Sequence, residues 1–495
     1  KGKLLRPDID LTYRIAELVN EEAKLHDISG SGEVRFMDEI NHASQIALSG
    51  SGSIGEILII SGDKKYHDKN ISYGFNLLNR AGIGLEAEMV KVESKNIMLL
   101  VSGEMDFLNN NLNLNGRLSL HDLDTLSRHI NEKITGSGEI IFTLQRDNNI
   151  FSATVDADIN RPSYKGAGAD RVSFGFNGRF NDHKGDGRIS AQVQRGEHIL
   201  NIMSGLALSD RDILFEKINI SGMETRINGN INYSRVKHFL NGIICISSDD
   251  LSGITSLSGY NITGTASGEL LFTEEKEGQR VGFQFTARDV EYKENLVEGI
   301  DITGHVSDIS GSQNFRLETS LRGYTFKEAE LETIEIIATG KKENARILIN
   351  GRANAPIETL FEAEAAVADK NGKKEAGLTH FMISFGETRI AIMEPLILRY
   401  SDDKTLIRGI NIGVDTGKIT GAMDYSTGGM HGDLHIEKIP LSLLSLAGIN
   451  ELEGAMDGKI SISGTPKMPD ISGSMDIRGA RVKGIKNSSI PPVDI

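Results

Sequence analysis

One short unit recurs along this chain: apolar and polar residues alternate, a glycine follows, and the alternation begins again. The clearest copy spans residues 452–482 and reads LEGAMDGKISISGTPKMPDISGSMDIRGARV. Alternation with period 2 directs every second side chain to the same face of a strand, and glycine lets the chain turn back on itself. A chain made of such units is predicted to form an extended β-sheet with one long apolar face.

The composition favours an all-β fold over a helical or fibrous one. The 495 residues include 54 glycines but only 9 prolines, so glycine makes up about 11% of the chain against about 7% in ordinary proteins. The glycines follow no strict period, which excludes collagen, and the many Ile, Leu and Val residues argue against disorder. The excess glycine is therefore best assigned to turns between many strands. Because Trp is absent and aromatic residues are 6%, a core built on large rings is not expected.

The charge and the cysteine usage exclude some classes of function. The net charge is −15, and no basic stripe with interleaved aromatics is present, so a nucleic-acid partner is not expected. A single cysteine, Cys245, allows no internal disulfide. It stands between Ile244 and Ile246, so we interpret it as a small buried apolar residue.

No segment of the sequence predicts a transmembrane helix or a signal peptide. The longest apolar run is Ile97 to Val101, far below the ~20 residues that a spanning helix needs. The sequence begins with Lys1 and ends at Ile495 within a strand-like pattern. We therefore expect a segment of a longer protein, with any membrane anchor outside it.

Helix is predicted in only a few places. Leu11, Ile15, Leu18 and Val19 have the i, i+4, i+7, i+8 spacing of an amphipathic helix near residues 10–25. This gives a helical lead-in over 1–28, followed by one continuous β-segment over 29–495. Short helical interruptions are expected near 121–132, 249–258 and 439–447.

A longer unit occurs three times, each time as a Leu-containing helical stretch followed by a glycine-marked strand. The three strands read ITGSGEIIF (134–142), ITGTASGELLF (262–272) and LEGAMDGKISI (452–462). Gly136, Gly264 and Gly454 hold the equivalent first-glycine position. Their separations of 128 and 190 residues are irregular, which excludes a fixed-period solenoid.

The third copy, with its preceding apolar stretch IPLSLLSLAGI, resembles the inner-membrane subunit family of the translocation and assembly module (TamB), within the AsmA-like, bridge-like lipid transfer group. Residues 393–426 resemble the segment that precedes this unit in such proteins. The resemblance extends over about the last hundred residues as similar sequence, and over most of the chain as a pattern of alternation and glycines.

The resemblance implies an elongated, U-shaped (taco-like) sheet of antiparallel type, whose interior is a continuous apolar groove. It implies a periplasmic protein, tethered to the inner membrane by an N-terminal anchor outside this segment. Such a protein carries phospholipid between the two membranes and contacts an outer-membrane β-barrel protein of the TamA type through regions outside this segment. No catalytic residue, cofactor or metal is implied.

The predicted groove is lined by aliphatic residues that alternate along strands. Acyl chains gain ~0.8 kcal/mol per methylene removed from water, so interchangeable aliphatic positions suffice to hold them. Period 2 leaves open whether this face is an open groove or a closed core. The candidate groove residues are Leu112, Leu114, Leu118, Leu120, Ile218, Ile220, Leu396, Leu398, Ile410, Ile412, Ile460 and Ile462.

Two motifs could indicate other chemistry, and both are interpreted as strand residues. Gly50, Gly52 and Gly55 match G-x-G-x-x-G, but a dinucleotide site needs a following helix, whereas EILIISGD reads as a strand and turn. His431 and His435 are spaced i, i+4, which on a helix could bind a metal. Their glycine-rich, alternating context predicts solvated histidines on a strand, and no enzymatic activity is predicted.

Three other functions compete with the lipid conduit. A scaffold could assist outer-membrane protein insertion or secretion by offering sheet edges for strand addition. An adhesin solenoid would show strict short repeats or calcium-binding nonapeptides, and neither is present. A transmembrane β-barrel needs aromatic girdles, which a chain with no Trp and 10 Tyr supplies poorly.

Overall fold

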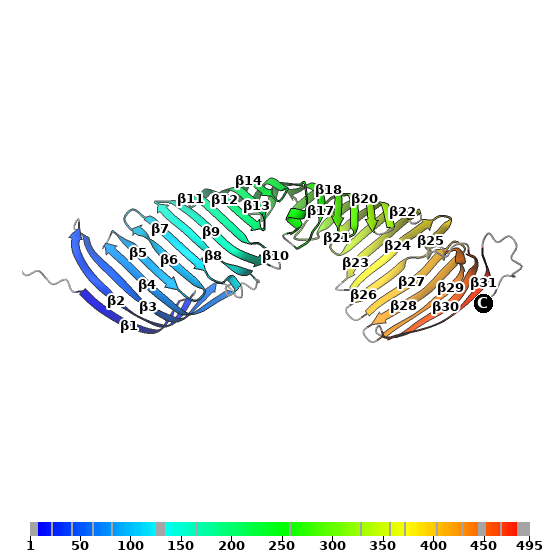
Figure 1. The fold of residues 1–495 in the computed structure, drawn as a ribbon, viewed down its shortest axis with the longest axis horizontal. Coiled ribbons are helices and arrows are strands. Elements are labelled where there is room, and N and C mark those ends of the chain that lie inside the picture. The colour runs from blue at the N-terminus through cyan, green and yellow to red at the C-terminus, as the bar shows by residue number, and fades with distance from the viewer. Residues whose placement is uncertain are drawn as a thin grey trace, which may run out of the picture. The chain divides into compact units, whose positions relative to one another are not determined.

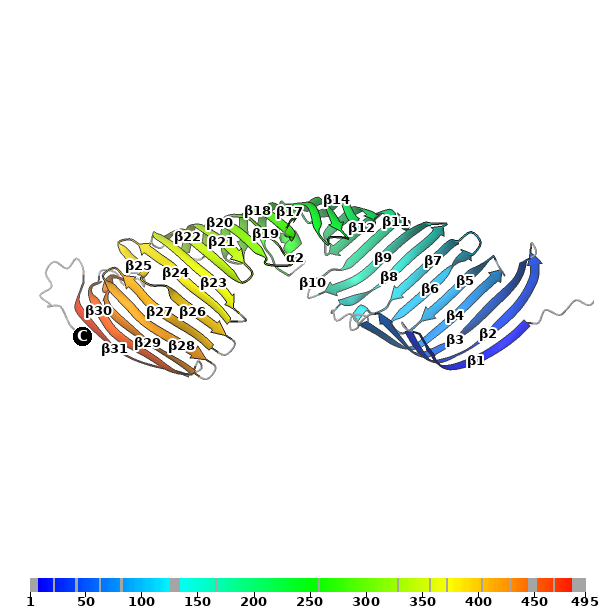
Figure 2. The same ribbon diagram turned by 180° about the vertical axis from the view of Figure 1, so that it is seen from behind.

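The structure is a computed structural model of residues 1–495. Figure 1 shows the ribbon, and Figure 2 shows the same ribbon from behind. The structure describes every residue outside these segments: 1–7, 21–22, 41–42, 62–63, 81–82, 125–133, 165–166, 257–258, 277, 327–328, 356–357, 371–372, 402–403, 427–428, 444–451, 466–467 and 483–495.

The predicted all-β fold is confirmed. Strands account for 84% of the chain and helices for 2%, and every recorded strand pair is antiparallel. Nearly all neighbours in the sheet are also neighbours in sequence, joined by short turns. This is the connection expected from the glycine and asparagine signals between alternating segments. The chain divides into two compact units, residues 1–262 and 263–495, which are described separately.

Unit 1 is a meander of sixteen strands and one short described helix, α2. Its strand β9 pairs with β8 on one side and with β10 and β11 on the other. The elements are β1 (Asp8–Val19), β2 (Ala23–Ile40), β3 (Ala43–Ser61), β4 (Lys64–Arg80), β5 (Gly84–Glu93), β6 (Ile97–Asp106), β7 (Asn111–Leu120), β8 (Ile134–Asp147), β9 (Ile150–Tyr164), β10 (Ala167–Gly168), β11 (Arg171–Phe180), β12 (Lys184–Arg195), β13 (His198–Ser209), β14 (Asp212–Gly222), β15 (Thr225–Ser234), β16 (Leu240–Ser248) and α2 (Ser252–Ser256).

Unit 2 is a second antiparallel meander. Strands β25 and β26 both pair with β24 and with β27, so these two short strands together fill one position in the sheet. The elements are β17 (Thr263–Glu275), β18 (Gly278–Tyr292), β19 (Asn295–Ser307), β20 (Asn314–Phe326), β21 (Ala329–Lys341), β22 (Asn344–Ala355), β23 (Thr359–Lys370), β24 (Lys373–Phe385), β25 (Thr388–Ile392), β26 (Leu396–Ser401), β27 (Lys404–Val414), β28 (Gly417–Ser426), β29 (Gly429–Pro440), β30 (Leu452–Thr465) and β31 (Met468–Val482).

The predicted helical lead-in over 1–28 is wrong. Residues Asp8–Val19 form strand β1, which pairs with β2 over most of its length. Leu11 and Ile15 fit a helical spacing, but together with Ile9 and Tyr13 they also fit period 2. Pairing with a long neighbouring strand satisfies the backbone and decides between the two patterns.

The helical interruptions are found where the structure describes them. Helix α2 lies within the predicted 249–258, which confirms that prediction. At 121–132, Leu123 and Asp124 are helical, while 125–132 lie outside the described residues. At 439–447 strand β29 ends at Pro440 and a 3₁₀ turn occupies 441–443, while 444–447 lie outside the described residues.

The three copies of the longer unit are structurally equivalent. Gly136, Gly264 and Gly454 have φ of +127°, +112° and +132°, and the strand register shifts at each of them. Each glycine faces a left-handed residue 25 positions later on the next strand, with φ between +47° and +64°. These residues are Arg161, Asp289 and Gly479. The repeat is therefore a paired β-bulge placed after a helical segment.

Candidate functional site

The register of unit 1 gathers its apolar residues on one face of the sheet, which we call the apolar face. Directly paired residues in an antiparallel sheet share a face, so a row can be followed from strand to strand. One such row runs through Gly103, Leu114, Leu144, Ala153, Gly178, Gly187, Leu206, Phe215, Ile231 and Gly242. The polar alternate positions form the opposite, polar face.

Unit 2 repeats this arrangement. A row of its apolar face runs through Leu270, Phe283, Gly304, Leu317, Ala338, Ile347, Ala365, Leu378 and Leu396. A second row, closer to the end of the unit, runs through Ile410, Gly421, Leu434, Ile460 and Gly473. Each unit therefore has an apolar face that is continuous across its strands.

All twelve candidate groove residues lie on these apolar faces. In unit 1, Leu112, Leu114, Leu118 and Leu120 share the face of β7, and Ile218 and Ile220 that of β14. In unit 2, Leu396 and Leu398 lie on β26, Ile410 and Ile412 on β27, and Ile460 and Ile462 on β30. Leu120 is buried, Leu398 is exposed, and the other ten are half-buried.

The apolar faces are only partly shielded from solvent. Strand β12 shows the alternation clearly, because Gly187, Ile189 and Ala191 are half-buried while the intervening polar residues are exposed. Among the described residues, no large side chain is less than 2% exposed. A closed core normally contains several such side chains. The faces therefore differ from the interior of a two-layer domain.

Phenylalanine rings lie flat on glycines of the neighbouring strand. A Cβ added to Gly116 would collide with the ring of Phe142, and one added to Gly351 would collide with Phe361. The two residues of each pair are directly opposite in the register. Aromatic rings that cover strand glycines protect the backbone and add apolar area. The apolar face is thus flattened where these pairs occur.

A tyrosine pair crosses the apolar face at the start of unit 1. Tyr13 on β1 and Tyr73 on β4 lie over Gly30 and Gly52, and their hydroxyl groups are hydrogen-bonded to each other. The Tyr73 hydroxyl also donates to the carbonyl oxygen of Ser29 at 3.3 Å. Burial, aided by the hydrogen bond with Tyr13, raises the pKa of Tyr73 to about 12. The Tyr73 hydroxyl is therefore neutral at physiological pH.

The polar face carries exposed cross-strand ion pairs. Arg346 Nη2 lies 2.9 Å from Glu364 Oε2, and Asp301 lies between Arg288 and Arg322 at 3.1 and 2.6 Å. The guanidinium of Arg346 lowers the pKa of Glu364, chiefly through its hydrogen bond. Exposed pairs of this kind contribute little to stability, because solvent screens them. The main effect of these ion pairs is to keep the polar face hydrated.

Cys245 was predicted to be buried, and this is wrong. It is exposed on the polar face of β16, opposite Asn228. Its neighbours Ile244 and Ile246 lie on the apolar face, and alternation therefore turns the cysteine outward. The apolar neighbours that suggested burial are the reason for its exposure.

The G-x-G-x-x-G motif and the pair of histidines His431 and His435 lie on strands, as predicted. Gly50, Gly52 and Gly55 lie within strand β3, which continues to Ser61 without a helix. His431 and His435 are exposed on β29. Within the described part of the chain, no cluster of three or more His, Cys, Asp or Glu side chains could hold a metal ion. None of the helices described there has the length and apolar character needed to cross a bilayer.

β-Bulges that the sequence analysis missed keep the apolar face continuous. In Phe215-Glu216-Lys217-Ile218 the register shifts, so Phe215 and Ile218 share a face although they are three residues apart. Ile436-Glu437-Lys438-Ile439 does the same in unit 2. The signal was an apolar-x-x-apolar spacing inside an alternating strand.

The two bulges also have the same hydrogen bond. Lys217 and Lys438 have φ of +50° and +51°. The Lys217 N–H donates to Asn230 Oδ1 at 2.8 Å, and the Lys438 N–H donates to Asp457 Oδ1 at 2.9 Å. A side chain on the next strand therefore satisfies a backbone donor that the bulge removes from the ladder.

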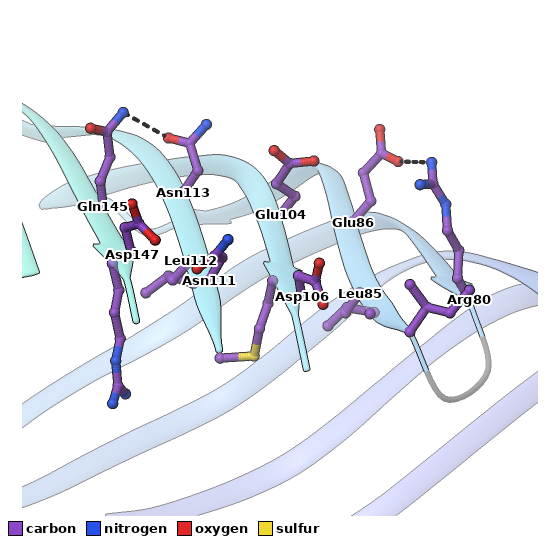
Figure 3. A pocket seen from close by; sticks show the side chains of 14 residues that line it. Arg80, Leu85, Glu86, Glu104, Asp106, Asn111, Leu112, Asn113, Gln145 and Asp147 are labelled. Atoms are coloured by element: carbon purple, nitrogen blue, oxygen red, sulfur yellow. Dashed lines mark hydrogen bonds and ion pairs between the residues drawn. The ribbon is translucent and has the colours of Figure 1, made fainter. Parts of the chain in front are cut away.

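A shallow hollow of about 390 Å³ lies at one edge of strands β4–β8. Figure 3 shows Glu86, Glu104, Asn113 and Gln145 pointing to one side of the sheet, and Leu85 and Leu112 to the other. Because these side chains diverge, they do not converge on a substrate. The hollow is the point where the polar and apolar faces meet.

No family model matches this sequence, and no curated protein matches it.

Proposed function

We propose that this chain is a lipid conduit that carries phospholipid along its apolar faces, between the inner and outer membranes of a diderm bacterium. The observation that carries the proposal is the continuous, half-buried apolar face of each unit. A face of this kind is a binding surface for molecules that present flexible hydrocarbon. In this proposal the sheet curves around that hydrocarbon as a groove.

The energetics suit mobile acyl chains better than a fixed ligand. Ten methylenes removed from water would gain about 8 kcal/mol, and the gain needs no directional contacts. Any position along the rows offers similar aliphatic groups, so a chain can move between rows without losing a specific bond. Where the face is flat, as at Gly116 beneath Phe142, few side chains obstruct a moving acyl chain.

The location and partners belong to the same proposal. The resemblance of residues 452–482 to the TamB family supports a periplasmic position, an inner-membrane anchor outside this segment, and an outer-membrane β-barrel partner of the TamA type. The chemistry is transport without catalysis, cofactor or metal. A scaffold for outer-membrane protein insertion is the competing function, in which the sheet edges and not the apolar faces would act.

The test uses one charge placed on either face of the same strand. Ile412→Asp puts a carboxylate on the apolar face of β27, opposite Ile419, while Asn411→Asp puts it on the polar face, opposite Thr420. Transfer of fluorescent phosphatidylethanolamine between vesicles is measured together with circular dichroism. We expect Ile412→Asp to stay folded and lose transfer, because an acyl chain cannot solvate a carboxylate. Asn411→Asp should keep both.

Three outcomes would contradict the conduit. Unfolding of Ile412→Asp would indicate a closed core. Equal transfer by both variants would remove the apolar face from the pathway. A third contrary result would be the absence of phospholipid from the gently extracted wild-type chain in native mass spectrometry.

A further inference from the structure

The two edges of the sheet in unit 1 differ in a way that orients any lipid on it. Residues 123–124 follow strand β7, and helix α2 follows strand β16. In this meander β7 and β16 run in the same direction, so their C-terminal ends, and the helical residues after them, lie at the same edge of the sheet. We call this edge the helix rim. We call the opposite edge the hairpin rim; it carries the turns at 107–110, 148–149, 181–183, 210–211 and 235–239.

The helix rim is the shielded end of the apolar face. Leu120, Leu200 and Met223 are 7–8% exposed there, and Thr225 and Ser248 are 3% and 4% exposed. Helix α2 contributes to this shielding. Gly253 packs against Met223, and the backbone carbonyl of Ser256 accepts a hydrogen bond from Arg195.

The hairpin rim is the open end of the same face. Large apolar side chains project from it with high exposure: Met105 is 42%, Phe107 57% and Leu108 70% exposed. Val236, on a later turn of this rim, is 68% exposed. Over β6 and β7, the apolar side chains at the hairpin rim are therefore far more exposed than Leu120 at the helix rim.

A single cation stands at the hairpin rim on the apolar face. Arg146 on β8 lies opposite Leu112 and Phe151, in the same row as Met105. In the described strands β6–β9, it is the only charged residue among the apolar-face positions. It also lines the hollow of Figure 3. Its Nε donates to the carbonyl oxygen of Asn148 at 3.0 Å.

The nearby carboxylates are engaged with other groups. Asp106 accepts hydrogen bonds from the Leu108 N–H at 2.9 Å and from the side-chain amide of Asn109 at 2.8 Å. The hydrogen bonds from the side chain and the backbone N–H of Asn109 are the main reason that the pKa of Asp106 is lowered. Asp147 accepts a hydrogen bond from the Asn148 amide at 3.0 Å. Among the described residues, no carboxylate is ion-paired with Arg146.

We propose that Arg146 binds the phosphate of a phospholipid, whose acyl chains extend over β6–β9 from the hairpin rim toward the helix rim. The inference rests on the proposed lipid-carrying function and adds a headgroup site and a direction to it. The strip from Leu112 to Leu120 is about 26 Å long at 3.3 Å per residue. It can hold one acyl layer, which is about half of a ~30 Å hydrocarbon core.

The test compares two ligands that share one chain. Oleoyl lysophosphatidate carries a phosphate, and monooleoylglycerol carries the same acyl chain without it. Equilibrium dialysis against the full 495-residue chain gives both affinities for the wild type, Arg146→Gln, Arg146→Lys and Arg117→Gln. Arg117 is the matched control, because it is exposed on the polar face of the adjacent strand β7.

We expect Arg146→Gln to weaken lysophosphatidate binding about tenfold, the effect of losing a hydrogen bond to a charged group, and to leave monooleoylglycerol binding unchanged. Arg146→Lys should recover part of the loss, and Arg117→Gln should change neither affinity. Equal affinities of wild type and Arg146→Gln for lysophosphatidate would overturn the headgroup site, and equal weakening of both ligands would indicate a general structural effect and overturn it too. If the wild type binds neither ligand, the proposed function fails together with this inference.

Discussion

The paired bulge at Gly264 provides a quantitative test of how the repeat shapes the sheet. Gly264 has φ of +112°, and a Cβ added there would lie 2.6 Å from the carbonyl oxygen of Asp289 and 2.8 Å from that of Arg288. These contacts are with backbone atoms, which cannot rotate away. Gly264→Ala must therefore either distort the bulge or hold alanine in a region that L-residues avoid.

The cost of Gly264→Ala can be worked from these contacts. The strained φ costs about 1–3 kcal/mol, and the overlap with the neighbouring strand costs about 1–3 kcal/mol. Restriction of the unfolded chain returns about 0.5–1 kcal/mol. The expected net loss of local stability is about 1–5 kcal/mol. The control is Gly377→Ala on β24, where the added Cβ meets nothing within 4 Å.

The assay should report on β17 and β18 alone, because a chain with two compact units need not unfold in a single step. Native-state hydrogen exchange of amides in these two strands gives their opening free energies. Gly264→Ala should lower them, and Gly377→Ala should leave them unchanged. Equal values for the two variants would refute the strain at Gly264 and, with it, the structural reading of the repeat.

Two further predictions concern unit 1. The pKa of Tyr73 is raised to about 12 against an ordinary 10.0, so the unfolded state loses this proton first as the pH rises. The stability that this pKa difference contributes is complete below pH 10 and declines as the pH rises toward 12. This pH dependence should be absent from Tyr73→Phe. Identical urea midpoints for the wild type and Tyr73→Phe across pH 9–12 would contradict the prediction. Cys245 is exposed on the polar face, so native protein should react fully with a maleimide at this position and keep its circular dichroism spectrum; reaction only in denaturant would show that it is buried.

The strands and their faces could be predicted because alternation is a local signal. The six pairs of predicted neighbours, such as Ile410 with Ile412, needed only the period of a strand. The same rule turns Cys245 outward, because it alternates with Ile244 and Ile246, which lie on the apolar face. At Leu11 and Ile15 the residues fit both periods, and only the pairing of β1 with β2 decides the matter.

Long-range packing could not be predicted in the same way. The flat rings over Gly116 and Gly351 depend on which residue of the next strand lies opposite, and this register is set by turns and bulges elsewhere. The Tyr13–Tyr73 hydrogen bond joins residues 60 positions apart across two intervening strands. In the sequence, Arg146 is one of several charged residues that precede a turn. Only the register, which pairs it with Leu112, places it on the apolar face.

The bulges explain how so long a chain keeps one face apolar. A strand pattern reverses its faces after every single-residue slip, and in an extended meander such slips would soon scatter the aliphatic residues over both faces. At three irregularities the spacing is apolar-x-x-apolar, so the face resumes in phase: Phe215 and Ile218, Ile407 and Ile410, and Ile436 and Ile439. The lysine N–H exposed by the first of these bulges is satisfied by Asn230, and the equivalent lysine in unit 2 by Asp457. Individual aliphatic residues on the face can then be exchanged for one another, whereas the bulge positions cannot, because they keep both halves of the bulged strand in phase with the apolar face.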